Sequence, residues 1–152
     1  MDTLPRIDRE VFIQRLSVAV DAARQDISHL GLLLIDLTNL ARINHHHGYA
    51  IGDKLLLSAY TQLLSVSKLP DTVFRVGSHR FAFILPDLGN PAFIALAMNK
   101  VQRVMKDELH GDSDMIGSEI KVGLAINRAG AREGMTMLAL AEASLAHAKL
   151  GG

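Results

Sequence analysis

Two features of this 152-residue sequence, a carboxylate and a predicted hairpin, together predict a ligand-binding site. Asp36 lies at the end of the run GLLLIDL, which is short, aliphatic and nearly continuous, as in a strand buried on both faces. Further along, Gly77, Ser78 and His79 are suited to a tight hairpin between two short strands. In the topology that these strands predict, both points lie at the ends of adjacent strands. Such a sheet edge is a common place for a ligand to bind.

Histidines provide two further candidates, both for metal binding. His45, His46 and His47 are consecutive, so their side chains point in different directions and cannot easily share one ion. A solvated loop is the favoured interpretation of this run. His79 and Asp36 form a possible pair for zinc or nickel, which imidazole suits better than it suits Mg²⁺. Two ligands are too few for a tight site, so we predict no metal site here.

The elements that must position these residues are helices that alternate with short strands. Apolar residues recur at helical spacing over 9–25, 50–65, 93–109 and from 137 onwards, and 38–44 favours a short helical stretch. Short aliphatic runs predict strands over 29–37, 72–76, 80–85 and 119–127, with loops over 86–91 and 110–118. The hairpin makes part of the sheet antiparallel. This order predicts an α+β sandwich of the ferredoxin-like kind, a central mostly antiparallel sheet flanked by helices.

Composition excludes several classes of function. Apolar residues make up 49% and charged residues 21%, which is typical of one packed domain over 1–152. Lys plus Arg equals Asp plus Glu at 16 each, so general nucleic-acid binding is not expected. The absence of cysteine excludes disulfides, thiolate zinc sites and cysteine nucleophiles. The apolar runs are too short to span a bilayer and the first residues lack a signal's apolar region, so we expect a cytoplasmic domain without membrane insertion.

Four stretches, in order along the chain, resemble one family. IDLTNLARINHHHGYAIGDKLL is similar to the signature D-x-D-x-F-K-x-I-N-D-x-x-G-H-x-x-G-D of GGDEF (diguanylate cyclase) domains. KLPDTVFRVGSHRFAFILP resembles R-x-x-D-x-x-x-R-x-G-G-D/E-E-F-x-x-L-P, AEASLAHAKLGG resembles A-D-x-A-L-Y-x-A-K-x-x-G, and LPRIDREVF resembles L-P-N-R-x-x-F. The resemblance spans nearly the whole chain. It implies the nucleotidyl-cyclase-like version of the sandwich, with the GGDEF motif on a β-hairpin.

The resemblance also implies a chemistry. Family members with the full motif join two GTP molecules into cyclic di-GMP, with the 3′-hydroxyl of one attacking the α-phosphate of the other across a dimer of domains. This chemistry depends on positioning and on divalent ions. Carboxylates hold Mg²⁺, because that ion prefers hard oxygen ligands in near-octahedral array.

The sequence departs from the family at these catalytic positions. Asp36 matches the first metal carboxylate, but Thr38 stands at the second aspartate and Ala41 at the phosphate-contacting lysine. The signature loop reads Gly77, Ser78, His79, Arg80 and Phe81. An imidazole and a guanidinium therefore replace two acids, and Arg80 adds positive charge where the metals should lie. We predict that Mg²⁺ binding and cyclase activity are lost and that no residue is catalytic.

The nucleotide-binding positions are better retained. The resemblance assigns Asn44 and Asp53 to guanine recognition and Lys149 to the phosphates, with Asp36 as the fourth candidate. GTP is therefore a possible ligand without metal. Lys149, Arg75 or Arg80 would then replace Mg²⁺ as the counter-charge of the phosphates.

Each of these residues also has a purely structural interpretation. Asp53 follows a glycine and suits a helix N-cap, and Asn44 suits a cap or a turn. Asp36 could bond loop amides at the end of its strand, and Arg75 could form a salt bridge on a strand surface. These alternatives stay open at the level of sequence.

The family's inhibitory product site, R-x-x-D, corresponds here to Lys68 and Asp71. Lysine keeps the positive charge but lacks the bidentate fork that a guanidinium offers to phosphate and guanine. We therefore interpret this site as vestigial.

The sequence thus predicts a catalytically inactive GGDEF domain that acts as a regulatory or scaffold module in cyclic di-GMP signalling. The resemblance implies an excised part of a longer protein, with EAL, sensor or receiver domains as attached or separate partners, and a homodimer is possible. A GTP-binding allosteric sensor is the alternative. An active cyclase with unusual metal ligands and an interaction module without a ligand are further alternatives.

Overall fold

The computed structural model describes residues 3–67, 72–109 and 119–151, with the backbone alone for 106–109. The helices are α1 (Arg9–Asp26), α2 (Leu40–His47), α3 (Tyr49–Val66), α4 (Phe93–Leu109) and α5 (Gly134–Leu150). The strands are β1 (His29–Leu37), β2 (Val73–Gly77), β3 (Arg80–Leu88) and β4 (Ile120–Asn127), and a short 3₁₀ helix, η2 (Arg128–Gly130), follows β4. No helix in these described ranges is both long and apolar enough to cross a membrane.

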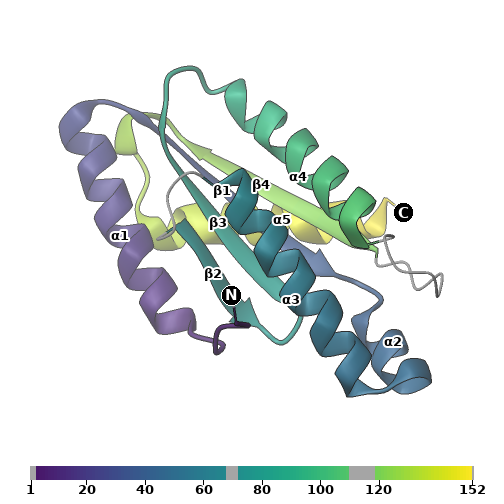
Figure 1. Cartoon of the computed structure of the whole chain (residues 1–152). Helices are drawn as coiled ribbons and strands as arrows, with labels where there is room; N and C mark the ends of the chain where they lie inside the picture. The colour runs from purple at the N-terminus through teal and green to yellow at the C-terminus, as the bar shows by residue number, and fades with distance from the viewer. Residues whose placement is uncertain (1–2, 68–71, 110–118, 152) are drawn as a thin grey trace.

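The four strands form one sheet in the order β2-β3-β1-β4, and each neighbouring pair is antiparallel. Helices cover both faces of this sheet. In Figure 1, α3 and α4 lie in front of the sheet and α5 lies behind it. This arrangement confirms the predicted α+β sandwich.

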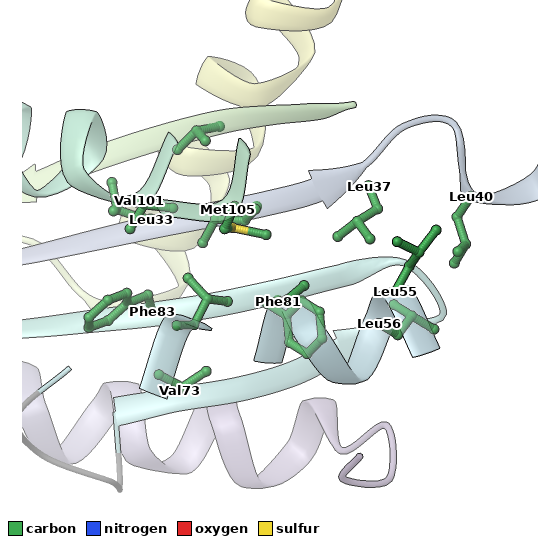
Figure 2. Close-up of a cluster of buried hydrophobic side chains, with 14 of the residues drawn as sticks. Leu33, Leu37, Leu40, Leu55, Leu56, Val73, Phe81, Phe83, Val101 and Met105 are labelled. Carbon is green, nitrogen blue, oxygen red and sulfur yellow. The ribbon is translucent and has the colours of Figure 1, made fainter. Parts of the chain in front are cut away.

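Side-chain alternation along β1 builds a core on each face of the sheet. Leu33, Ile35 and Leu37 face α2, α3 and α4, where they pack with Phe81 and Phe83 of β3 (Figure 2). The even-numbered leucines of the same strand face α1 and α5. Burying each of these side chains stabilises the fold by about 1.5–3 kcal/mol. The central strand is therefore the main hydrophobic support of both layers.

Local hydrogen bonds order the chain before α1 and α5. Asp8 caps α1, because its Oδ1 accepts from the Val11 amide at 3.0 Å. Asn127, at the end of β4, is fully buried and holds the following loop. Its Nδ2 donates to the Arg132 carbonyl at 2.8 Å, and its Oδ1 accepts from the Arg132 amide at 2.9 Å. These bonds connect the end of β4 to the segment that leads into α5.

β3 differs from its predicted extent. The strand continues to Leu88, although residues 86–91 were predicted to form a loop. The register of β1 with β3 shifts after Leu85, so Pro86 lies in an irregular stretch of the ladder. A proline is tolerated there because no ladder hydrogen bond needs its missing N–H. The prediction was wrong for residues 86–88, because proline does not reveal whether it ends a strand or lies in a bulge, whereas 89–91 form neither helix nor strand, as predicted.

The three consecutive histidines also differ from prediction. His45, His46 and His47 form the last turn of α2 and not a loop, although all three are exposed as expected. Imidazoles at a helix C-terminus lie near its unpaired carbonyls, which is a favourable place for a partial positive charge. The helix therefore extends further than its apolar residues alone indicate.

Gly123 of β4 gives a direct test of how α5 packs on the sheet. A Cβ at this position would lie 2.4 Å from the Leu145 amide nitrogen and 2.5 Å from the Ala141 carbonyl oxygen. Gly123→Ala should therefore lower the free energy of unfolding by about 1–3 kcal/mol, measured by urea denaturation, because backbone must move. Gly134→Ala is the control, because the nearest atom to its Cβ, on Leu16, is 3.6 Å away. Equal losses in both variants would contradict this packing.

Candidate functional site

Asp36 lies at the end of β1, on the face that α5 covers, and its side chain is fully buried. The sheet register places Arg80 of β3 opposite it on one side and Lys121 of β4 opposite it on the other. Two basic residues therefore flank the carboxylate within the sheet. Lys149, in the last turn of α5, supplies a third.

Both oxygens of the Asp36 carboxylate have cationic partners. Arg80 Nε donates to Oδ1 at 2.6 Å and Nη2 donates to Oδ2 at 3.1 Å, so the guanidinium binds the carboxylate bidentately. The Lys149 ammonium forms an ion pair with Oδ2. The contacts described for the Asp36 carboxylate are thus with side chains. The alternative interpretation, in which this carboxylate bonds loop amides, does not match these contacts.

The protonation of this cluster follows from its contacts. Burial alone would raise the pKa of Asp36, but the hydrogen bonds and charges of Arg80 and Lys149 outweigh burial and hold that pKa below its usual value. The hydrogen bond with Asp36 in turn raises the pKa of Arg80 against the opposing effect of burial. The contacts thus favour the charged forms of both Asp36 and Arg80.

A weaker chain of charges leads outward from the cluster. Arg80 Nη1 lies 4.0 Å from Glu142 Oε2 on α5, and Arg9 Nη2, at the start of α1, lies 3.8 Å from the same oxygen. These groups are partly exposed, so water screens them and each pair contributes about 0–1 kcal/mol. Sequence analysis missed Glu142, although it lies seven residues before Lys149 and so on the same helix face.

The residues around Asp36 do not fit the Mg²⁺ ions that the family resemblance implies. Thr38 Oγ1 donates to the Glu119 carbonyl, and the exposed His79 has its Nδ1 3.0 Å from Ser78 Oγ. Within the described ranges, no three His, Cys, Asp or Glu side chains lie close enough together to hold a metal ion. The structure also does not pair His79 with Asp36. The acid that remains is occupied by cations, so the donor set opposes a two-metal site.

A hollow of about 360 Å³ lies beside the cluster. It is lined by Thr38, His79, Glu119, Lys121 and Lys149. Glu119 Oε1 lies 3.6 Å from Arg42 Nη2, so its charge is partly offset. Sequence analysis missed Lys121, which the register of β4 against Asp36 brings into this hollow.

The two guanine-recognition candidates lie on α2 and α3. A Cβ on Gly52 would fall 1.7 Å from Asn44 Oδ1, so the Asn44 amide packs directly against the glycine that precedes Asp53. Asn44 Oδ1 is buried and has no hydrogen-bond partner in the described part of the chain. Asp53 is exposed and lies within α3, whose N-cap is Gly48. The capping interpretations of Asn44 and Asp53 were therefore wrong.

Arg75 of β2 has contacts that neither sequence interpretation anticipated. Its Nη1 donates to the Pro5 carbonyl at 3.3 Å and its Nη2 to the Ser78 carbonyl at 3.1 Å. Burial lowers the pKa of the guanidinium, and the charge of Asp53 opposes this effect. Arg75 thus holds two backbone segments together, a role that the sequence did not indicate.

The other residues of the signature loop form the hairpin turn or pack in the core. Ser78 and His79 form the turn between Gly77 and Arg80, which pair across the hairpin. Phe81 is fully buried and stacks on Tyr60, with ring centroids 6.1 Å apart. The candidates for the inhibitory site, Lys68 and Asp71, lie outside the described residues.

Known proteins share both the sequence pattern and the fold. The chain is 26% identical over 127 residues to the diguanylate cyclase TpbB of Pseudomonas aeruginosa, covering 82% of the chain and 29% of TpbB. It is 22% identical over 149 residues to the bifunctional diguanylate cyclase and cyclic di-GMP phosphodiesterase MucR of the same species, covering 97% of the chain and 22% of MucR. The chain thus spans less than a third of either relative.

The fold agrees with a solved GGDEF structure. The GGDEF domain of DgcB from Caulobacter crescentus, in complex with c-di-GMP, superposes with a TM-score of 0.85 at 21% identity, covering 100% of this chain and 91% of that one. The family described as "Diguanylate cyclase, GGDEF domain" matches residues 1–152. By this match over its whole length, the chain belongs to the GGDEF family of diguanylate cyclase domains.

Proposed function

We propose that this chain is a GGDEF domain without cyclase activity that serves as a regulatory or scaffold module in cyclic di-GMP signalling. The observation that carries the proposal is the bidentate pair between Arg80 and the buried Asp36 carboxylate. A metal ion at this carboxylate would have to displace a guanidinium, and Lys149 would remain on the second oxygen. Mg²⁺ would gain no further carboxylate in exchange, because Thr38 and His79 stand at the other acid positions.

The regulatory role is supported by what the chain retains. Both hydrophobic cores are built from apolar side chains at other positions, so the packing of the two cores does not use the metal positions. The relative MucR combines a cyclase and a phosphodiesterase in one protein, and the chain spans 22% of its length. We infer that EAL, sensor or receiver domains, attached or separate, or a second copy are the partners on which this module acts.

A second candidate function is metal-independent GTP binding. It is favoured by Asn44 Oδ1, a buried acceptor without a partner in the described ranges, close to Gly52 and Asp53. An amide oxygen and a carboxylate can accept hydrogen bonds from the N–H groups of guanine. The ion pair of Lys149 with Asp36 weakens this candidate, because it reduces the charge available to a phosphate.

Activity and metal binding test the main proposal together. The chain should form no cyclic di-GMP from GTP with Mg²⁺ or Mn²⁺, measured by chromatography of the products. Mn²⁺ should leave its Tm unchanged, but should raise the Tm of a variant with Thr38→Asp, His79→Glu and Arg80→Glu, because that variant offers Asp36 acidic neighbours.

Arg80→Ala is the matched control for that experiment, because it removes the cation without adding a carboxylate. Its Tm should not respond to Mn²⁺. Product formation by the unaltered chain, or a Tm that rises with Mn²⁺ in the unaltered chain, would refute the proposal.

Calorimetry tests the GTP candidate. Binding at micromolar concentration should be the same with and without Mg²⁺, and Asp53→Ala should weaken it about tenfold or more, as expected for a lost charged hydrogen bond. Asp26→Ala, at the far end of α1, is the control and should bind as the unaltered chain does. If no heat is measured at high GTP concentration in either buffer, GTP binding is ruled out. The remaining interpretation is then a scaffold that does not bind this ligand.

Stability tests the Asp36 cluster itself. Asp36→Asn should lower the free energy of unfolding by about 2–3 kcal/mol at pH 7, less than a fully buried pair loses, because Arg80 and Lys149 are partly exposed. A lowered carboxyl pKa stabilises the fold above the pKa of the unfolded chain, about 4, and this stability is lost as the pH falls through the folded pKa. The difference between variant and unaltered chain should therefore shrink below about pH 4.

Urea denaturation between pH 7 and pH 2.5 measures this difference. Asp21→Asn, an exposed carboxylate on α1, is the control and should change stability by less than about 0.5 kcal/mol. A loss for Asp36→Asn that does not change with pH would show that the Asp36 charge is not what stabilises this site.

A further inference from the structure

The residues that precede α1 cross the free side of β2. Leu4 packs against the core on the side of α2, α3 and α4. The Asp8 amide then donates to the Arg75 carbonyl of β2 at 2.9 Å. α1 follows and packs its Phe12 into the core on the opposite face of the sheet. Segment 3–8 therefore passes around one edge of the sheet and is hydrogen-bonded to it.

Arg75 connects this segment to the turn of the signature hairpin. Its backbone accepts from Asp8, its Nη1 donates to the Pro5 carbonyl, and its Nη2 donates to the Ser78 carbonyl. One planar guanidinium therefore spans two backbone segments that are far apart in the sequence. Its Nε is buried and has no acceptor in the described ranges. A buried Nε without an acceptor is energetically unfavourable. The side chain keeps this position because the hydrogen bonds of Nη1 and Nη2 to the two carbonyls hold it there.

The Ser78–His79 turn is itself connected to the Asp36 cluster. The His79 carbonyl accepts from the Leu37 amide at 2.9 Å, and Leu37 follows Asp36 in β1. Arg80, which follows the turn, binds Asp36 directly. A movement of the turn would therefore change the geometry of both partners of the buried ion pair.

A second, weaker connection runs in parallel. Arg9, at the start of α1, lies 3.8 Å from Glu142, which lies 4.0 Å from Arg80. Partly exposed pairs at these distances are screened by water. The connection through Arg75 is the stronger one, because it consists of hydrogen bonds to backbone carbonyls.

We propose that Arg75 couples the position of segment 3–8 to the Ser78–His79 turn, so that displacing the segment loosens the turn and the Asp36–Arg80 pair. This inference rests on the proposed regulatory function, since it gives the module a route by which a change before α1 reaches the signature hairpin. The coupling requires only that segment 3–8 has a bound and a displaced arrangement, and that these two differ in their hydrogen bonds to Arg75.

Hydrogen exchange of the Leu37 amide in the full chain tests this coupling. Asp8→Pro removes the amide that binds β2, whereas Asp8→Ala keeps that amide, and both variants lose the capping carboxylate. Asp8→Ala should raise exchange at Val11, which the cap protects, and leave Leu37 unchanged. Asp8→Pro should also raise Leu37 exchange, by about tenfold, the effect of one weakened hydrogen bond.

Combining Asp8→Ala and Asp8→Pro each with Arg75→Lys tests whether the coupling passes through the Arg75 side chain. Lysine lacks the fork that reaches both carbonyls, so Asp8→Pro should then add nothing to Leu37 exchange. An unchanged Leu37 in Asp8→Pro, an equal effect in both backgrounds, or equal acceleration at the distant Ser28 and Met137 amides would overturn the proposal. These readouts do not involve metal or product, so failure of the coupling is distinct from failure of the proposed lack of cyclase activity.

Discussion

The buried carboxylate of Asp36 is the constraint on which the site depends. A fully buried charge is tolerated only where it is paired and hydrogen-bonded, and Asp36 receives its partners from two other elements, Arg80 on β3 and Lys149 on α5. These ion pairs connect the end of β1 to the start of β3 and to the last turn of α5. The same contacts that permit burial also set the protonation state, because the two cations outweigh the effect of burial on the pKa of Asp36.

This arrangement inverts the charge pattern that the family signature implies. In the signature, several carboxylates surround cations, whereas here cationic side chains surround one carboxylate. Arg80 stands where the signature has an acid, and it binds the Asp36 carboxylate directly. The inversion leaves the packing of the two apolar cores on the faces of β1 intact, because these cores contain none of the charged groups.

The fold was predictable because its signals are local and repeated along the chain. The aliphatic run of β1 and the helical spacing of α1, α3 and α4 each indicate an element without knowledge of the others. The ion pairs were not predictable in the same way. Residue types showed that Arg80 brings positive charge near Asp36, but the bidentate contact depends on sheet register, and the bond of Arg75 to the Pro5 carbonyl depends on the path of a segment without regular structure. Contacts of that kind follow from tertiary packing, which leaves no periodic signal in the sequence.

The unsatisfied polar atoms belong to residues outside the Asp36 ion-pair cluster. In the described part of the chain, the buried side-chain atoms without a partner are Asn44 Oδ1 and Arg75 Nε. Asn44 packs against Gly52, and the Asp53 charge acts on Arg75, so both atoms belong to the region around the start of α3. The Asp36 carboxylate is thus paired by Arg80 and Lys149, whereas Asn44 Oδ1 and Arg75 Nε retain unmet hydrogen-bonding capacity in the described ranges. Unpaired buried groups are costly, and one of the two belongs to Arg75, the residue that also holds segment 3–8 and the hairpin turn.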